Sequence, residues 1–193
     1  MKKWIFGLGF LLAVLAGTAF AQCDLPAEFE HAAVVTDGNF RITVGTLRAD
    51  YRQGDVIEFQ VVTTNTGAAA ETLQWPVEYP DALIVTDPAC DDIRETIGSW
   101  LFRYPPFLFY VPGSETLAPG ECRVRTMAWD TAADPVDPGV YRVWGGLVAW
   151  PVESIFEPGW GWILDPAILE ITIDEAVSRD EVTWGQIKAR YSN

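Results

Sequence analysis

Side chains that could catalyse a reaction are sparse in this sequence. His31 is the only histidine, so a Ser-His-Asp triad would have to use it, and it lies in a polar stretch near the amino end. Four serines lie in no recognisable nucleophile turn: Ser99, Ser114, Ser154 and Ser178. We interpret His31 as structural and assign no catalytic residue, so the sequence predicts a protein that is not an enzyme.

Carboxylates are plentiful, and two groups of them could offer hard oxygen ligands to Ca²⁺. These groups are Asp91-Asp92 and the set Asp130, Asp134 and Asp137. Neither has the spacing of a known calcium loop, so we interpret them as solvated turn residues. A zinc site is not expected, because no two cysteines are close and there is a single histidine. The sequence therefore predicts no metal and no cofactor.

Aromatic residues are the better lead to a binding site. Trp150, Phe156, Trp160 and Trp162 lie within one segment, 150–163. Exposed aromatic rings supply a large apolar area at a modest entropy cost, which suits a sugar ring or a protein hot spot. We take these four residues as candidate ligand-binding residues. The alternative, in which they fill the core or pin the loop, stays open.

Three cysteines allow one disulfide in an oxidising compartment. Cys90 follows an expected strand and Cys122 begins another, so the sequence favours a Cys90–Cys122 disulfide. The spacing leaves Cys23 open as an alternative partner.

The first 21 residues have the pattern of a secretory signal peptide. Two lysines precede an apolar run over 5–16, and Ala19-Phe-Ala21 fits the small-x-small cleavage pattern. We expect a mature chain that begins at Gln22 and is secreted or periplasmic. A lipoprotein would need a small residue before the acceptor cysteine, whereas Gln22 precedes Cys23. No later stretch is long and apolar enough to span a bilayer.

The chain is strongly acidic, with 27 Asp and Glu against 13 Lys and Arg and a net charge of −14. Such a charge disfavours binding to nucleic acid or to an anionic membrane surface. It favours solubility or a basic partner.

Side chains alternate in character along most of the sequence, as they do in half-buried strands. The clearest example places Ile57, Phe59, Val61 and Thr63 on one face, with Val62 as the exception on the other. Turn residues, including Pro119-Gly120 and Pro138-Gly139, separate the alternating runs, and this pattern predicts an all-β, immunoglobulin-like antiparallel β-sandwich. The expected strands span 40–48, 57–64, 71–75, 82–86, 97–104, 107–111, 122–129, 140–150 and 167–173.

Two local signals refine this organisation. Gly145-Gly146 inside a strand predicts a bulge or a close backbone approach. Thr183 and Gln186 have the spacing of a capping box, which predicts a short C-terminal helix over about 184–191. We expect a signal peptide at 1–21, an N-terminal leader at 22–39, the sandwich domain at 40–173 and a tail with the helix at 174–193.

Several motifs resemble the BsuPI family, whose founding member is an intracellular proteinase inhibitor of a Bacillus. The motifs are Gly54-Asp55 through Asn65, Leu117-Ala-Pro-Gly-Glu121, Trp129-Asp130 and Pro138-Gly-Val-Tyr141. The resemblance covers roughly residues 40–150. It implies an immunoglobulin-like sandwich that binds a protein partner, with a serine proteinase as a candidate. The export signal and the long segment 150–165 depart from the family, and no inhibitory residue can be carried over.

The sequence as a whole predicts an exported, non-enzymatic binding module that acts by protein–protein contact, as a BsuPI-type proteinase inhibitor would. The alternative is a carbohydrate-binding module that uses the aromatic segment 150–163 to hold a glycan. A hydrolase is the least supported class.

Overall fold

The structure is a computed structural model, and it describes residues 23–77, 81–90, 100–104, 110–149, 161–162 and 164–176. The expected signal peptide and the helix expected over 184–191 both lie outside these residues. Within the described ranges, no helix is long and apolar enough to cross a membrane.

The described residues form an all-β structure, as the alternating pattern predicts. The strands are β1 (His31–Asp37), β2 (Phe40–Thr46), β3 (Asp50–Arg52), β4 (Val56–Asn65), β5 (Glu71–Val77), β6 (Asp81–Thr86), β7 (Trp100–Tyr104), β8 (Tyr110–Leu117), β9 (Cys122–Asp130), β10 (Gly139–Ala149), β11 (Gly161–Trp162) and β12 (Ala167–Asp174).

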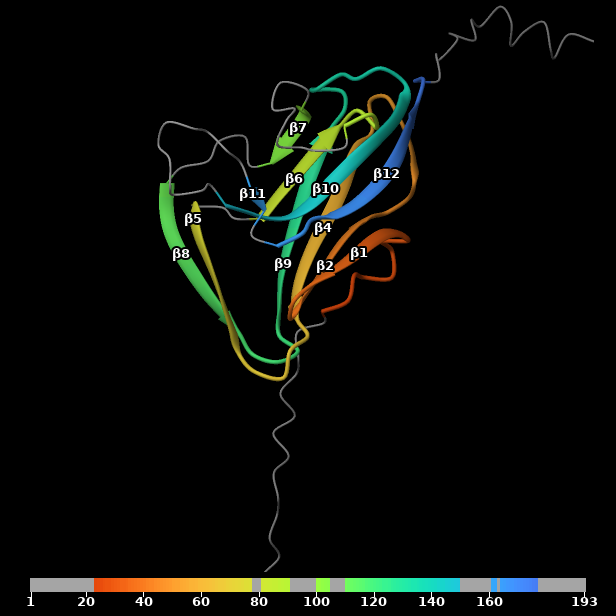
Figure 1. Cartoon of the computed structure of the whole chain (residues 1–193). Helices are drawn as coiled ribbons and strands as arrows, with labels where there is room; N and C mark the ends of the chain where they lie inside the picture. Colours follow the sequence, from red (N-terminus) through yellow and green to blue (C-terminus); the bar gives the residue numbers. More distant parts are fainter. Residues whose placement is uncertain are drawn as a thin grey trace, which may run out of the picture.

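The strands assemble into two main sheets and a separate ribbon (Figure 1). One sheet has the order β1-β2-β4-β9 and is antiparallel throughout. The other has the order β3-β12-β10-β6-β7, with β11 paired to β10, and only its β3–β12 pair is parallel. Strands β5 and β8 pair only with each other and form the ribbon at the left of Figure 1.

The two main sheets stack on one hydrophobic core. Ile57, Phe59 and Val61 of β4 point into it, and every second residue of β12 meets them from the other sheet. At Gly145 a Cβ atom would lie 2.8 Å from Cγ2 of Val44 on the opposite sheet. The β10 backbone therefore lies too close to the Val44 side chain for any side chain at position 145, which confirms the close approach expected at this glycine.

A proline-glycine turn leads into β9 as the sequence predicts. The amide of Glu121 donates to the carbonyl of Ala118 at 2.9 Å, and Gly120 has φ of 78°. This is the geometry of a type II turn, which favours proline at its second position and needs glycine at its third. The buried Asn65 fastens the same turn, because its side-chain amide donates to the carbonyl of Leu117 at 2.8 Å.

The segment expected as a leader contributes a strand, because His31–Asp37 forms β1 at the edge of the four-stranded sheet. The residues before it cross the outer face of that sheet. Cys23 bonds to Cys122 on β9, and the side chain of Leu25 lies against Gly45 on β2. Val62 lies between these two points and is only 1% exposed although it faces outward. Residues 23–30, which we call the crossing segment, therefore account for the one exception in the alternation of β4.

The predicted Cys90–Cys122 disulfide is wrong. The disulfide joins Cys23 to Cys122, whose Cα atoms are 5.5 Å apart, a normal bridging distance. Cys90 is buried with Ile84 and Trp144 on the six-stranded sheet, whereas Cys122 begins β9 of the other sheet. The strand before Cys90 is β6 and the strand that begins at Cys122 is β9, and these two strands belong to different sheets. A disulfide is typical of oxidising compartments, which agrees with the expected export.

Candidate functional site

The loop between β9 and β10 is held rigidly at one end of the sandwich. Thr131 is buried, and its hydroxyl donates to the carbonyl of Asp55 at 2.8 Å while accepting the amide of Gly54 at 2.9 Å. The side-chain amide of Gln53 donates to the carbonyl of Val136 at 2.7 Å. The turn before β4 therefore acts as a scaffold for the loop.

Tyr141 fixes the point where this loop enters β10. Its hydroxyl donates to the carbonyl of Asp137, four residues earlier. Its buried ring lies edge-on to Trp129, with the ring centroids 6.2 Å apart. This is a tyrosine corner, and together with the two-layer antiparallel arrangement it is a hallmark of immunoglobulin-like sandwiches.

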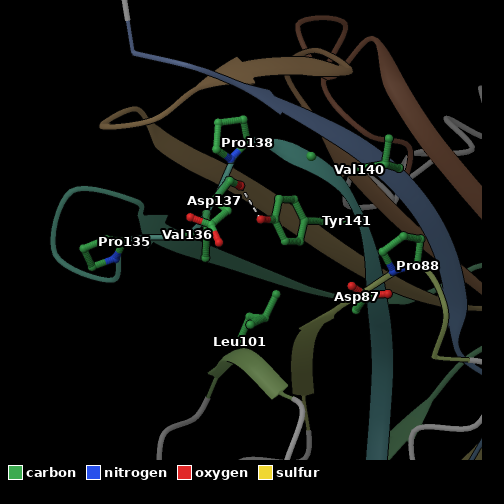
Figure 2. Close-up of a pocket in the computed structure, with 10 residues that line it drawn as sticks. Asp87, Pro88, Leu101, Pro135, Val136, Asp137, Pro138, Val140 and Tyr141 are labelled. Carbon is green, nitrogen blue, oxygen red and sulfur yellow. Dashed lines mark hydrogen bonds between the residues drawn. The ribbon is translucent and has the colours of Figure 1, made fainter.

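A pocket of about 590 Å³ opens beside this corner (Figure 2). Three separate stretches of chain line it: Asp87 and Pro88 after β6, Leu101 of β7, and residues 135–141. Its volume lies within the range of roughly 300–1,000 Å³ that is usual for ligand sites. Prolines at 88, 135 and 138 restrict the backbone of the walls, so the pocket is formed before any ligand arrives.

The walls of the pocket combine apolar and acidic groups. Leu101 and Val140 are each 43% exposed, which is high for apolar side chains within strands. Asp87 and Asp137 lie on either side of the Tyr141 ring (Figure 2). Burial raises the pKa of Tyr141 above its usual value, and the charges of Asp137 and Asp87 raise it further. The phenol therefore stays neutral, and the described lining of the pocket carries net negative charge.

The structure describes only part of the predicted aromatic site. Trp150, Phe156 and Trp160 lie outside the described residues. Trp162 belongs to β11, and its backbone pairs with Val148 of β10. Binding of a glycan by this segment stays a prediction.

The other candidate residues have structural roles where they are described. His31 donates from Nε2 to the carbonyl of Glu170 at 2.6 Å and so links β1 to β12. The carboxylate of Asp130 accepts the amide of Ala132 at 2.9 Å, as expected of a turn residue. Among the described residues, no group of three or more His, Cys, Asp or Glu side chains could hold a metal ion. Asp91 and Asp92 lie outside the described residues, and of Asp130, Asp134 and Asp137 only Asp137 lines the pocket.

The sequence reasoning missed this pocket. From the sequence, Asp87-Pro88 marks the end of one strand and Pro138-Gly139 the turn that opens another, and Pro135 has no assigned role. A denser than usual group of prolines around acidic residues was the available signal. That signal does not reveal which turns lie side by side.

Neither a scan against protein-family models nor a search of curated proteins gives a match to this chain. Solved structures do resemble it at low similarity. A β-glucosidase from Listeria innocua in complex with isofagomine is 14% identical with a TM-score of 0.40, and the match covers 71% of this chain and 16% of that one. A β-glucosidase from Erythrobacter marinus is 17% identical with a TM-score of 0.37, over 67% of this chain and 14% of that one.

A CARDB domain from Pyrococcus furiosus, in complex with di-metal ions, is similar over its whole length. It is 16% identical with a TM-score of 0.35, and the match covers 79% of this chain and 100% of that domain. Similarity at this level carries no argument about activity or metal binding. The resemblance to the BsuPI family therefore stays a prediction from the sequence motifs.

Proposed function

We propose that this protein is an exported, non-enzymatic binding module, secreted or periplasmic, that contacts another protein through the pocket at the tyrosine corner. The observation that carries the proposal is the pocket itself, which is formed in advance by proline-rich walls and presents two exposed apolar side chains, Leu101 and Val140. Binding residues are commonly placed on loops that a rigid scaffold positions. The cross-links from Gln53, Gly54 and Asp55 to the loop provide such a scaffold.

A pair of matched substitutions tests this proposal. Val140→Trp fills the pocket from β10, whereas Val34→Trp makes the same change on β1 of the other sheet, where the side chain is 60% exposed. The wild type and both variants are immobilised and used to capture proteins from the native envelope fraction, and the captured proteins are quantified by mass spectrometry.

We expect a partner that the wild type and Val34→Trp recover equally and that Val140→Trp recovers about tenfold less, because the substitution removes a pocket for an anchoring side chain. Equal recovery of every captured protein with the two variants would place the contact elsewhere. Measured turnover of a substrate by the purified protein would contradict the proposal that the protein is not an enzyme.

The proteinase version of this proposal follows from the BsuPI resemblance and has its own test. A panel of active serine proteinases is titrated with the wild type, and residual activity is measured. Stoichiometric inhibition that Val140→Trp weakens and Val34→Trp preserves supports an inhibitor that acts through the pocket. Full activity of every proteinase removes the inhibitor version and leaves the binding module.

A further inference from the structure

The charges around the pocket restrict what can enter it. Of the ten lining residues that the structure describes, none is Lys, Arg or His, and two are aspartates. Within the part of the chain that the structure describes, neither Asp87 nor Asp137 forms an ion pair. The chain as a whole has a net charge of −14. An acidic pocket on an acidic molecule attracts cationic groups and repels carboxylates and phosphates.

The two aspartates are positioned by the local backbone. Oδ1 of Asp87 accepts the amide of Ala89 at 2.8 Å, which holds this carboxylate in a turn. Asp137 is fixed through its main chain, because its carbonyl accepts the Tyr141 hydroxyl and Pro138 follows it. A carboxylate held in a turn, as that of Asp87 is, loses little conformational freedom when a ligand arrives.

The remaining described walls are mainly apolar, and this feature favours a long basic side chain over a simple cation as the ligand. Leu101 and Val140 offer exposed hydrocarbon beside the carboxylates, and Val136 is half-buried next to them. Lysine and arginine bury an aliphatic stem against apolar surface while their charged head meets a polar partner. A wholly apolar side chain would desolvate the two carboxylates without offering a partner, which is unfavourable.

Building on the proposed function, we infer that the corner pocket binds a lysine or arginine side chain of the partner protein. Its aliphatic stem lies against Leu101 and Val140, and its cationic group lies between Asp87 and Asp137.

Three small probes test the inference directly. The protein is purified after export of the full chain, labelled with ¹⁵N, and titrated with the N-acetyl methylamides of lysine, arginine and norleucine. Norleucine has the length of the lysine stem without the charge. We expect the two basic probes to shift the amide signals of Leu101, Val136 and Val140, and norleucine to bind about tenfold more weakly.

Two double variants with the same change of charge provide the control. Asp87→Asn with Asp137→Asn neutralises the pocket and keeps an oxygen that can accept the Ala89 amide. Glu28→Gln with Glu58→Gln neutralises two exposed residues that do not line the pocket. We expect the first pair to abolish the lysine-induced shifts and the second pair to preserve them. If the first pair does not fold, Asp137→Asn alone gives the same comparison.

The inference fails if norleucine binds as well as lysine, if both double variants bind lysine equally, or if no basic probe shifts the pocket signals. The capture experiment separates this failure from failure of the proposed function. If a partner is lost by Val140→Trp but is still captured by the double asparagine variant, the proposed binding module is supported. The inference that a basic side chain occupies the pocket is then contradicted. A partner that Val140→Trp retains overturns the proposed function itself.

Discussion

Single polar side chains hold the loops of this protein by bonding to backbone groups. Asn65, Thr131 and Tyr141 are all buried, and each pairs with a main-chain group far along the chain or across a turn. A buried carbonyl without a donor costs free energy, so each of these side chains stabilises the particular loop conformation that it bonds. The pocket depends on this because its longest wall, residues 135–141, contains the Tyr141 corner.

Removal of one hydroxyl tests the corner at the residue scale. We expect Tyr141→Phe to lower the free energy of unfolding at neutral pH by about 1–2 kcal/mol, because the carbonyl of Asp137 loses its donor. Urea unfolding followed by circular dichroism measures this loss. Unchanged stability at neutral pH would contradict the role of the corner.

The pH dependence of Tyr141 has a definite sign. Its pKa in the folded state is raised, first by burial and then by Asp137 and Asp87. Its stabilising contribution is therefore complete below its ordinary pKa of about 10 and is lost as the pH rises from there through the folded pKa. We expect the wild type to lose more stability than Tyr141→Phe between neutral pH and about pH 11. Parallel losses in the two proteins would contradict this.

At the scale of elements, one arginine adds polar contacts between the β5–β8 ribbon and the sandwich, beside the core packing of Leu73 and Leu117. Arg123 of β9 forms bidentate hydrogen bonds with Asp81 at the start of β6, at 2.6 to 3.0 Å, and also contacts Glu115 of β8. Its guanidinium lies 4.9 Å from the ring centroid of Trp75 on β5. Hydrogen bonds to Asp81 are the largest cause that raises the pKa of Arg123, so the cation is permanent. One side chain thus joins both main sheets and both strands of the ribbon.

We expect Arg123→Met to lower the free energy of unfolding by about 3–5 kcal/mol, because the side chain of Asp81 is only 5% exposed and would be left unpaired. Thermal and urea unfolding measure the loss. Arg48→Met is the control, because the exposed Arg48–Asp55 pair should contribute no more than about 1 kcal/mol. Adding Asp81→Asn to Arg123→Met should restore part of the stability. Equal losses for the two arginines would show that burial does not matter here.

At the scale of the whole molecule, the disulfide joins two distant parts of the chain. Cys23 and Cys122 are 99 residues apart in sequence, and their bond fastens the crossing segment to the far side of the four-stranded sheet. Asp24 adds an ion pair with Arg41 at 3.3 Å, and Leu25 fills the space over Gly45. The segment before β1 therefore forms part of the sheet's outer surface.

We expect Cys23→Ser to lower the free energy of unfolding by about 2–5 kcal/mol, because the unfolded chain regains the freedom that the closed loop removes. Cys122→Ser should cost about as much, and the double variant no more than either single change, because one bond is lost in every case. Chemical denaturation of the three variants measures this. Losses that add in the double variant would assign the cysteines separate roles. Non-reducing peptide mapping should recover the Cys23–Cys122 linkage.

Local pattern was enough to predict most of the strands because alternation is a property of consecutive residues. The core-facing side of β4, the proline-glycine turn before β9 and the close approach at Gly145 all follow from residues within a few positions of one another. The strands β1, β3 and β11 were not foreseen, and β8 continues to Leu117, beyond the segment expected over 107–111. Strands β1 and β3 lie at sheet edges, where pairing with a neighbour rather than an alternating apolar run defines them.

The sequence alone determined an all-β chain with antiparallel layers, a strongly acidic charge and the turn that leads into Tyr141. Only the tertiary structure decided which layer each strand joins, and with it the partner of Cys122 and the existence of the pocket. Asp87, Leu101 and Asp137 come together because β6, β7 and β10 belong to the same sheet. The order of strands in a sheet is set by pairing between distant segments, and a local periodicity of two carries no information about which segments pair.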